Sequence, residues 1–327
     1  MPKFSFWVPE GALFASVTML MDAFAIANLW QSSFTGDDTP LFRTEILTTG
    51  GTPVNALGDI PVLPHGAVEA SASTDCLVVA PFLPNVTPMP TDLEVLGGWI
   101  DPLRRAGTPI ATVCTGTFIL AELGLLNDRT ATTNWQDARM FQRRYPRVNL
   151  TPQFMLTEDE GILCTGAATA VYHLALHFIR VDGSNRLAAT CSKALLVDPN
   201  RNSQTPYVLT RPRRNHGDAQ VLAAQELMEE GYAAIDSVDA VAKAVGISPR
   251  HFKRRFKSAT GDLPSKYLQR IRIEAAKERL ETTRDSIEEI TWAVGYRDVS
   301  SFSRLFKQHT EISPRAYREK FFIPVLG

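Results

Sequence analysis

The last hundred residues contain one segment twice, and this internal repeat restricts the possible folds more than any other feature. The stretch "VDAVAKAVGISPRHFKRRFKSATGDLPSKYL" aligns with "IEEITWAVGYRDVSSFSRLFKQHTEISPRAYR", with one additional residue in the turn of the second copy. The alignment pairs Gly246, Phe252, Phe256, Pro264 and Tyr267 with Gly295, Phe302, Phe306, Pro314 and Tyr317. Each copy predicts a short helix, a glycine-containing turn and a second helix, which together form a helix-turn-helix unit.

The second helix of each copy is predicted to have an apolar and a polar face. Ser248 is a suitable N-cap and Pro249 suits the first helical position, so we expect the first of these helices to begin there. Phenylalanines spaced by four residues are expected to point inward in both copies. The polar face then presents Arg250, His251, Lys253, Arg254 and Lys257 in the first copy, and Ser300, Ser301, Ser303, Arg304 and Lys307 in the second.

These polar faces have the composition of DNA-recognition helices, which offer donors to base edges while neighbouring cations bind phosphates. Arg254 and Arg304 occupy matching positions, and arginine can bind guanine O6 and N7 through two hydrogen bonds. From Arg211 onward the chain has 21 Lys+Arg against 16 Asp+Glu, a charge of +5, whereas the preceding part has 13 against 19, a charge of −6. For one helix a solvated charged face would be the preferred interpretation. The repeat and the charge favour two helices that enter major-groove segments about 34 Å apart.

The first two hundred residues alternate apolar runs with helical patterns. "FSFWVP", "FRTEILTT", "DCLVVAP" and "PIATVC" predict strands of a mainly parallel sheet covered on both faces, and "PQFMLTEDEGILCTG" predicts a hairpin. Periodicity is lost over residues 198–217, which predicts domains at 1–197 and 218–327 joined by a linker. No apolar run reaches the roughly 18 residues of a membrane span, and the N-terminus lacks the pattern of a signal peptide. We therefore expect a cytoplasmic protein without a membrane partner.

In "VCTGTFILAELGLLNDRTATTNW" a predicted strand ends at Cys114 and a helix follows at once. This is the arrangement of a nucleophile elbow, in which the side chain is exposed above the sheet and the helix dipole lowers the thiol pKa. The four cysteines are far apart in the sequence, with no CxxC pair and no histidine at ligand spacing: Cys76, Cys114, Cys164 and Cys191. We expect reduced thiols, no metal site and no cofactor.

The segment from about 221 to 321 resembles the AraC-type DNA-binding domain through "AVGISPRHFKRRFK", "GDLPSKYLQRIRIEAAKERL", "EITWAVGYRDVSSFSRLFKQ" and "SPRAYREKF". The resemblance implies sequence-specific binding to double-stranded promoter DNA, usually as a homodimer, with base contacts on the helices that start near Ser248 and Val299. Glu311 departs from the family, which has glycine there, as the first copy has at Gly261. This difference affects the close of the turn and leaves the reading face unchanged.

Residues 3–197 resemble the PfpI-type, class I glutamine amidotransferase-like domain in its GlxA form, through "DCLVVAP", the elbow segment and "TGAATAVYHLALHFI". The resemblance implies a flavodoxin-like α/β fold. Thr115 replaces the histidine that follows the nucleophile in catalytic relatives, and "APFLP" replaces their glycine pair. Asn134 and His173 replace a histidine and an acidic residue of the GlxA form. Loss of a positioned base and an oxyanion hole removes two contributions of about a hundredfold or more each.

Three roles for the N-terminal domain stay open at this point. If the domain is a hydrolase, Cys114 needs an altered catalytic pair with His173. If it is a scaffold, the domain serves dimerisation and the cysteine is only a small residue at a tight turn. We favour a non-enzymatic sensor for a small-molecule effector, because open α/β sheets bind ligands at the carboxyl ends of their strands. The resemblance implies that an acidic residue of the first loop, here Glu10, can hydrogen-bond the thiol. The expected lining of the site is Glu10, Pro81, Phe82, Cys114, Thr115 and Asn134.

Overall fold

The computed structural model describes residues 1–71, 73–82, 89–209 and 214–323. It divides into two compact units, an N-terminal unit of Met1–Gln204 and a C-terminal unit of Thr205–Gly327. The division falls within the predicted linker 198–217, of which residues 210–213 lie outside the described part. The limits of that linker stay a prediction.

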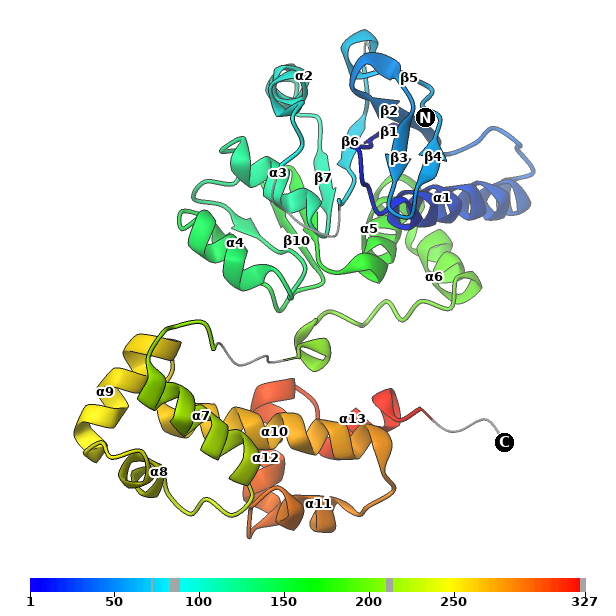
Figure 1. Ribbon diagram of the computed structural model, residues 1–327. Helices are drawn as coiled ribbons and strands as arrows, with labels where there is room; N and C mark the ends of the chain where they lie inside the picture. Colours follow the sequence, from blue (N-terminus) through cyan, green and yellow to red (C-terminus); the bar gives the residue numbers. More distant parts are fainter. Residues whose placement is uncertain (72, 83–88, 210–213, 324–327) are drawn as a thin grey trace. The chain divides into compact units, whose positions relative to one another are not determined.

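The N-terminal unit is built on a seven-stranded sheet (Figure 1). In spatial order its strands are β10 (Leu156–Asp159), β11 (Ile162–Thr165), β7 (Ile110–Val113), β6 (Cys76–Val79), β1 (Lys3–Trp7), β2 (Arg43–Thr48) and β5 (Gly66–Ala67). All neighbouring strands are parallel except the β10–β11 hairpin, whose turn places Glu160 and Gly161 at positive φ. The order β2–β1–β6–β7–β11 is that of a flavodoxin-like sheet, so the predicted fold class is confirmed.

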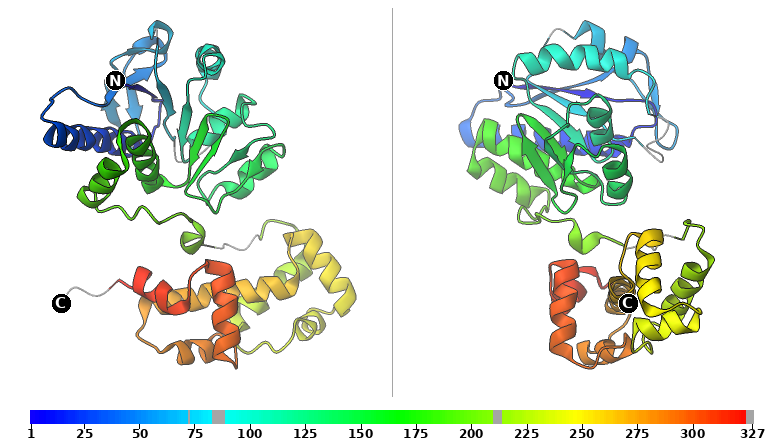
Figure 2. Two further views of the ribbon diagram at one scale, coloured as in Figure 1. Left: turned by 180° about the vertical axis from the view of Figure 1, so that it is seen from behind. Right: turned by 90° about the vertical axis from the view of Figure 1, so that its left-hand side faces the viewer.

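Helices cover both faces of this sheet (Figures 1 and 2). One face packs against α1 (Phe14–Thr35), α5 (Val171–Phe178) and α6 (Asn185–Ala194), and the other against α2 (Leu93–Arg105), α3 (Gly116–Glu122) and α4 (Ala138–Arg144). Strands β6, β7 and β11 are buried along their whole length, which explains their continuous apolar runs. Two small sheets complete the unit: β3 (Val54–Ala56) with β4 (Ile60–Val62), and β8 (Thr130–Ala131) with β9 (Asn149–Leu150). Across the described residues, no helix combines the length and the apolar character that a membrane span requires.

The described residues of the C-terminal unit are helical in all their regular structure. Its main helices are α7 (Ala219–Gly231), α8 (Val238–Ala244), α9 (Pro249–Thr260), α10 (Pro264–Thr282), α11 (Ile287–Ala293), α12 (Val299–Thr310) and α13 (Pro314–Phe321). The pairs α8–α9 and α11–α12 are the two predicted helix-turn-helix units. Helix α10 contributes Tyr267 to the core of the first unit and Ile273 and Leu280 to the core of the second. This long helix therefore packs against both units.

The sequence repeat is also a repeat of packing. Phe252, Phe256, Phe302 and Phe306 are completely buried. The ring of Phe256 lies 5.1 Å from that of Tyr267, and the equivalent ring of Phe306 lies 5.3 Å from that of Tyr317. Truncation of such a buried phenylalanine to alanine costs about 3–5 kcal/mol. The two cores therefore fix the polar faces of α9 and α12 with respect to their own units.

Candidate DNA-reading face and nucleophile elbow

The polar faces of α9 and α12 contain all ten residues that the repeat indicates. Nine of them are exposed and Ser303 is half-buried. Lys253 forms an ion pair with Asp239 of α8, with 3.1 Å between Nζ and Oδ1. An exposed pair of this kind contributes only about 0–1 kcal/mol, so Lys253 can exchange this carboxylate for a phosphate at little cost.

Three further cations of the first reading helix have no acidic partner among the residues that the structure describes. Within the part of the chain that the structure describes, Arg250, Arg254 and Lys257 form no ion pair. In the second helix, Arg304 Nη2 donates to Ser301 Oγ at 3.3 Å and has no carboxylate partner among the described residues. These cations keep their hydrogen-bond donors available for an anionic ligand, as a DNA-reading surface requires.

The starts of the two reading helices are as predicted, but their caps differ. Ser248 occupies the N-cap position and Pro249 the first turn, yet the Ser248 side chain makes no capping hydrogen bond. For α12 the cap is Asp298, whose Oδ1 accepts the Ser301 amide at 2.7 Å. Hydrogen bonds from Ser301 also lower the pKa of Asp298. The Asp-x-x-Ser spacing could have predicted this cap, and our sequence analysis missed it.

The sequence analysis also missed a clamp between α9 and α7. The half-buried Arg255 pairs through Nε with Asp218 Oδ2 at 2.5 Å, and Asp218 caps the first turn of α7 by accepting the Val221 amide. The partners are 37 residues apart, so no local pattern indicates the contact. Arg255 thus holds the reading helix in place, whereas its neighbour Arg254 is exposed.

Glu311 closes the second helix-turn-helix unit in the conformation that Gly261 uses in the first. Both residues are left-handed, with φ of 64° and 84°, and each amide donates to the carbonyl four residues earlier. A side chain other than glycine is strained there. Glu311→Gly should therefore stabilise the C-terminal unit by about 0.5–1 kcal/mol.

Hydrogen exchange of α12 and α13 peptides in the intact chain would measure this gain, and Gly261→Ala is the matched substitution with the opposite expected sign. The Glu311 carboxylate also accepts a hydrogen bond from Thr205 Oγ1 at 3.1 Å. Unchanged or faster exchange in Glu311→Gly would show that this exposed contact outweighs the backbone strain.

The elbow geometry predicted for Cys114 is present. Cys114 joins β7 to α3 with a φ of 54°, in the left-handed region that residues other than glycine seldom adopt. A Cβ on Gly116 would lie 2.7 Å from the carbonyl oxygen of Val79, so the helix start needs glycine to approach β6. Thr133 Oγ1 donates to the Cys114 carbonyl at 2.8 Å and fixes the turn from the other side.

The expected exposure and thiolate character of Cys114 are wrong. The residue is only 3% exposed. Burial raises the thiol pKa to about 12 and outweighs the backbone hydrogen bond from Thr115, which acts in the opposite direction. The elbow directs this side chain into packed surroundings, where desolvation disfavours the charged form.

We therefore expect native Cys114 to resist alkylation by iodoacetamide at pH 8. A pKa of about 12 leaves a thiolate fraction of about one in ten thousand at that pH. The raised pKa also makes the stability of the fold depend on pH. The contribution of the neutral thiol to the free energy of unfolding is complete below pH 9.0, its ordinary pKa, and is lost as the pH rises from 9 towards 12. Mass spectrometry of tryptic peptides would measure labelling, with Gln142→Cys as an exposed positive control. Labelling of Cys114 as fast as that of the control would contradict a sealed elbow.

Thr115 occupies the position of the missing histidine and is fully engaged. Its Oγ1 accepts the Phe82 amide at 3.0 Å and donates to the Phe82 carbonyl at 2.8 Å. Both residues are buried. The Phe82 N–H is the type of group that would stabilise an oxyanion, and here it is already bound.

The other residues of the expected site are spread around the elbow. Glu10 is exposed and its carboxylate accepts the Asn55 amide at 3.0 Å; no hydrogen bond joins it to Cys114 within the described residues. Asn134 is buried, and its amide group bonds to Gln136 and Asp137. A cavity of about 440 Å³ has Glu10 and Phe82 in its lining, but not Pro81, Cys114, Thr115 or Asn134.

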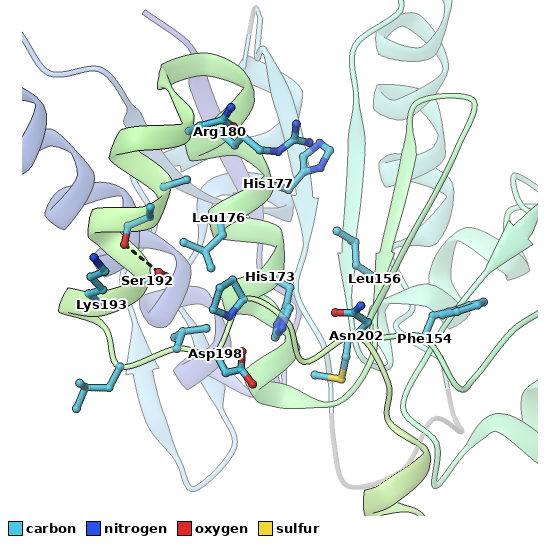
Figure 3. A pocket seen from close by; sticks show the side chains of 17 residues that line it. Phe154, Leu156, His173, Leu176, His177, Arg180, Ser192, Lys193, Asp198 and Asn202 are labelled. Atoms are coloured by element: carbon cyan, nitrogen blue, oxygen red, sulfur yellow. Dashed lines mark hydrogen bonds between the residues drawn. The ribbon is translucent and has the colours of Figure 1, made fainter. Parts of the chain in front are cut away.

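His173 does not form the altered pair with Cys114 that was left open. It lies on α5 and lines a different cavity, in which Cys114 takes no part (Figure 3). The four cysteines are buried free thiols. In the ranges the structure describes, no group of three or more His, Cys, Asp or Glu side chains could hold a metal ion.

Both units are similar to parts of known proteins. The helix-turn-helix domain family matches residues 241–320. A crystal structure of an AraC family transcriptional regulator from Pseudomonas putida superimposes with a TM-score of 0.51 and 21% identity, over 60% of this chain and all of that one, which shows the fold of the N-terminal unit. The transcriptional regulator GlxA of Rhizobium meliloti is 26% identical over 90% of this chain and 94% of its own. The transcriptional regulator CdhR of Pseudomonas aeruginosa is 30% identical over 84% of this chain and 81% of its own.

The chain belongs to the AraC family of transcriptional regulators, in its GlxA-type branch. This GlxA-type regulator is a DNA-binding transcription regulator, as the repeated helix-turn-helix units predicted. Its curated relatives are named as regulators of transcription. Among the described residues at the elbow, Cys114 is buried and the Phe82 amide is already bound by Thr115.

Proposed function

We propose that this regulator binds promoter DNA sequence-specifically as a homodimer and places α9 and α12 in successive major-groove segments. The observation that supports this proposal is the repeated reading face. In each of the two helices, two phenylalanines are buried, and the matched polar residues therefore face outward. In this arrangement Arg254 and Arg304 bind base edges, because an arginine without a carboxylate partner can direct its guanidinium group at a guanine. The flanking residues contact phosphates or sugars: Arg250, His251, Lys253, Lys257, Ser300, Ser301, Ser303 and Lys307.

Footprinting of the full-length chain on a duplex selected from random sequences tests this arrangement. Each copy of the protein should protect two segments on one face of the duplex, separated by one helical turn, about 34 Å. Affinity should fall steeply with salt, because phosphate contacts release counterions. A single protected segment for each copy would contradict the use of both helices.

We further propose that the N-terminal unit dimerises and binds a small-molecule effector, which changes the placement of the two DNA-binding units of the dimer through the linker. The first candidate site is the elbow region predicted from the sequence, with Glu10, Pro81, Phe82, Cys114, Thr115 and Asn134. The cavity beside Glu10 and Phe82 supports that candidate. A regulator of promoters acts where the chromosome lies, which supports a cytoplasmic location.

Operator binding titrated with a panel of metabolites, for wild type and Cys114→Ala, tests the elbow candidate. A shift in affinity that Cys114→Ala abolishes would support an effector at the elbow. An unchanged affinity with every metabolite would contradict a sensor role and leave dimerisation as the function of the unit.

A further inference from the structure

A second cavity of the N-terminal unit lies away from the elbow, between β10, α5, α6 and the chain that follows α6 (Figure 3). Its volume is about 1010 Å³. Cavities that bind small molecules commonly measure about 300–1,000 Å³, so it has room for a ligand of considerable size. Apolar side chains form much of the lining, among them Met155, Leu156, Leu176 and Val197.

A half-buried histidine lies in this lining. Both ring nitrogens of His173 are shielded from solvent, and neither has a hydrogen bond of good geometry with a described residue, although the backbone of Asp198 and Arg201 lies close enough to act on its pKa. Burial and the neighbouring Arg201 lower the pKa of His173. The lowered pKa favours the neutral ring, which has one N–H donor and one acceptor nitrogen. A buried polar group of this kind costs free energy unless a ligand or water pairs with it.

The charges around the cavity favour an anion. Arg180 and Lys193 line it and form no ion pair within the described segments, whereas Asp198 is its one acidic lining residue. His177 also lines it, 3.9 Å from Glu158, and burial lowers its pKa. With both histidines neutral, the titratable lining has a net charge of +1, from two cations and one anion. In Figure 3, Arg180 and His177 lie at one end of the cavity, and His173 lies further down, between Asp198 on one side and Asn202 on the other.

Two local irregularities border the same cavity. Helix α5 continues into a π-helical turn, Ile179–Gly183, which includes Arg180, and such turns are frequent at functional sites. Leu196, just after α6, is left-handed with a φ of 53° and is 93% exposed. This exposed apolar side chain, on a strained backbone, can pack against the apolar part of a ligand in the cavity.

We infer that this cavity binds an amphipathic organic anion, a monocarboxylate whose apolar body covers Leu156 and Leu176 and whose polar groups meet His173, Arg180 and Lys193. Calling this ligand the effector rests on the proposed function, whereas its binding does not. The wall formed by Val197, Asp198, Pro199 and Asn202 is the last stretch of the N-terminal unit, which ends at Gln204. A ligand that contacts this stretch touches the chain that continues into the DNA-binding unit.

Titration calorimetry on the full-length chain tests the inference with hexanoate, octanoate and decanoate as probes and octan-1-ol as the uncharged comparison. Affinity should rise roughly three- to fourfold for each methylene group buried. The alcohol should bind more weakly than octanoate, and Lys193→Gln should reduce this difference.

Two tryptophan variants on one helix provide the decisive comparison. Ala189 and Ala194 are both exposed residues of α6, but only Ala189 lines the cavity. Ala189→Trp should weaken octanoate binding at least about tenfold by filling the cavity, and Ala194→Trp should bind as wild type does. Cys114→Ala should also bind normally.

Equal binding by Ala189→Trp and wild type would overturn the site, and loss of binding in Cys114→Ala would move the ligand to the elbow. If no carboxylate binds at millimolar concentration, the ligand class is wrong. If Ala189→Trp changes the oligomeric state and leaves octanoate binding intact, the cavity is part of an interface between copies of the chain and not a ligand site. DNA binding is measured separately, so its failure would refute the proposed function without affecting the test of the cavity.

Discussion

Arg254→Ala and Arg304→Ala are each expected to weaken binding to the selected DNA site by about 5- to 150-fold, equivalent to about 1–3 kcal/mol. Each side chain is exposed on a helix whose opposite face is fixed by two buried phenylalanines, so the truncation should not disturb folding. A lost bidentate contact with guanine should relax specificity at one base pair and leave the others unchanged. Competition binding with single-base variants of the site would measure the loss at each position.

The controls separate base reading from general attraction to phosphates. Lys257→Ala should weaken binding to specific and random duplexes by the same factor and reduce the salt dependence. Arg315 is an exposed arginine of α13, paired with Glu319 outside the reading helices, and Arg315→Ala should leave both affinities nearly unchanged. Equal losses on specific and random DNA for both Arg254→Ala and Arg304→Ala would refute their assignment as base readers.

The C-terminal unit was largely predictable because its determinants are local and occur twice. Phe252 and Phe256 recur as Phe302 and Phe306, and in each copy a proline or aspartate marks a helix start. The α/β unit was predictable at the level of its strands, since buried parallel strands are continuous apolar runs. The elbow at Cys114 was also predictable, because a strand that passes directly into a helix must turn sharply there.

The environment of the elbow was not predictable, because it depends on contacts between distant segments. Thr115 and Phe82 are 33 residues apart, and their paired hydrogen bonds bind the amide that an oxyanion would need. The sequence identified His173 as unusual, but its neighbours in space come from β10, α6 and the chain after α6. Only the fold could show that this histidine faces the cavity between these elements rather than Cys114.

Gln204→Ala is expected to destabilise the N-terminal unit by about 3–5 kcal/mol, because several buried backbone groups lose their partner at once. Gln204 is 2% exposed. Its Oε1 accepts the Ala167 amide at 2.9 Å, and its two Nε2–H groups are shared among the carbonyls of Thr133, Pro152 and Phe154, which lie 2.9–3.0 Å away. One side chain thus joins the loops after β8, β9 and β11. Hydrogen exchange of β7 and β11 peptides in the intact chain would measure the loss.

The controls for Gln204 are an exposed glutamine of the same unit, a second substitution at Gln204 and the hydrogen exchange of the other unit. Gln142→Ala removes an exposed glutamine of α4 and should leave exchange unchanged. Gln204→Glu keeps the shape but loses the amide donors, so its effect should be at least as large as that of alanine because it buries a charge. In both Gln204 variants the peptides of α10 should exchange as in wild type, since Tyr267 and Leu280 pack within the C-terminal unit. A loss of unfolding free energy below about 1 kcal/mol in Gln204→Ala would mean that water replaces the amide. The end of the N-terminal unit would then be held by the residues next to Gln204 in the sequence.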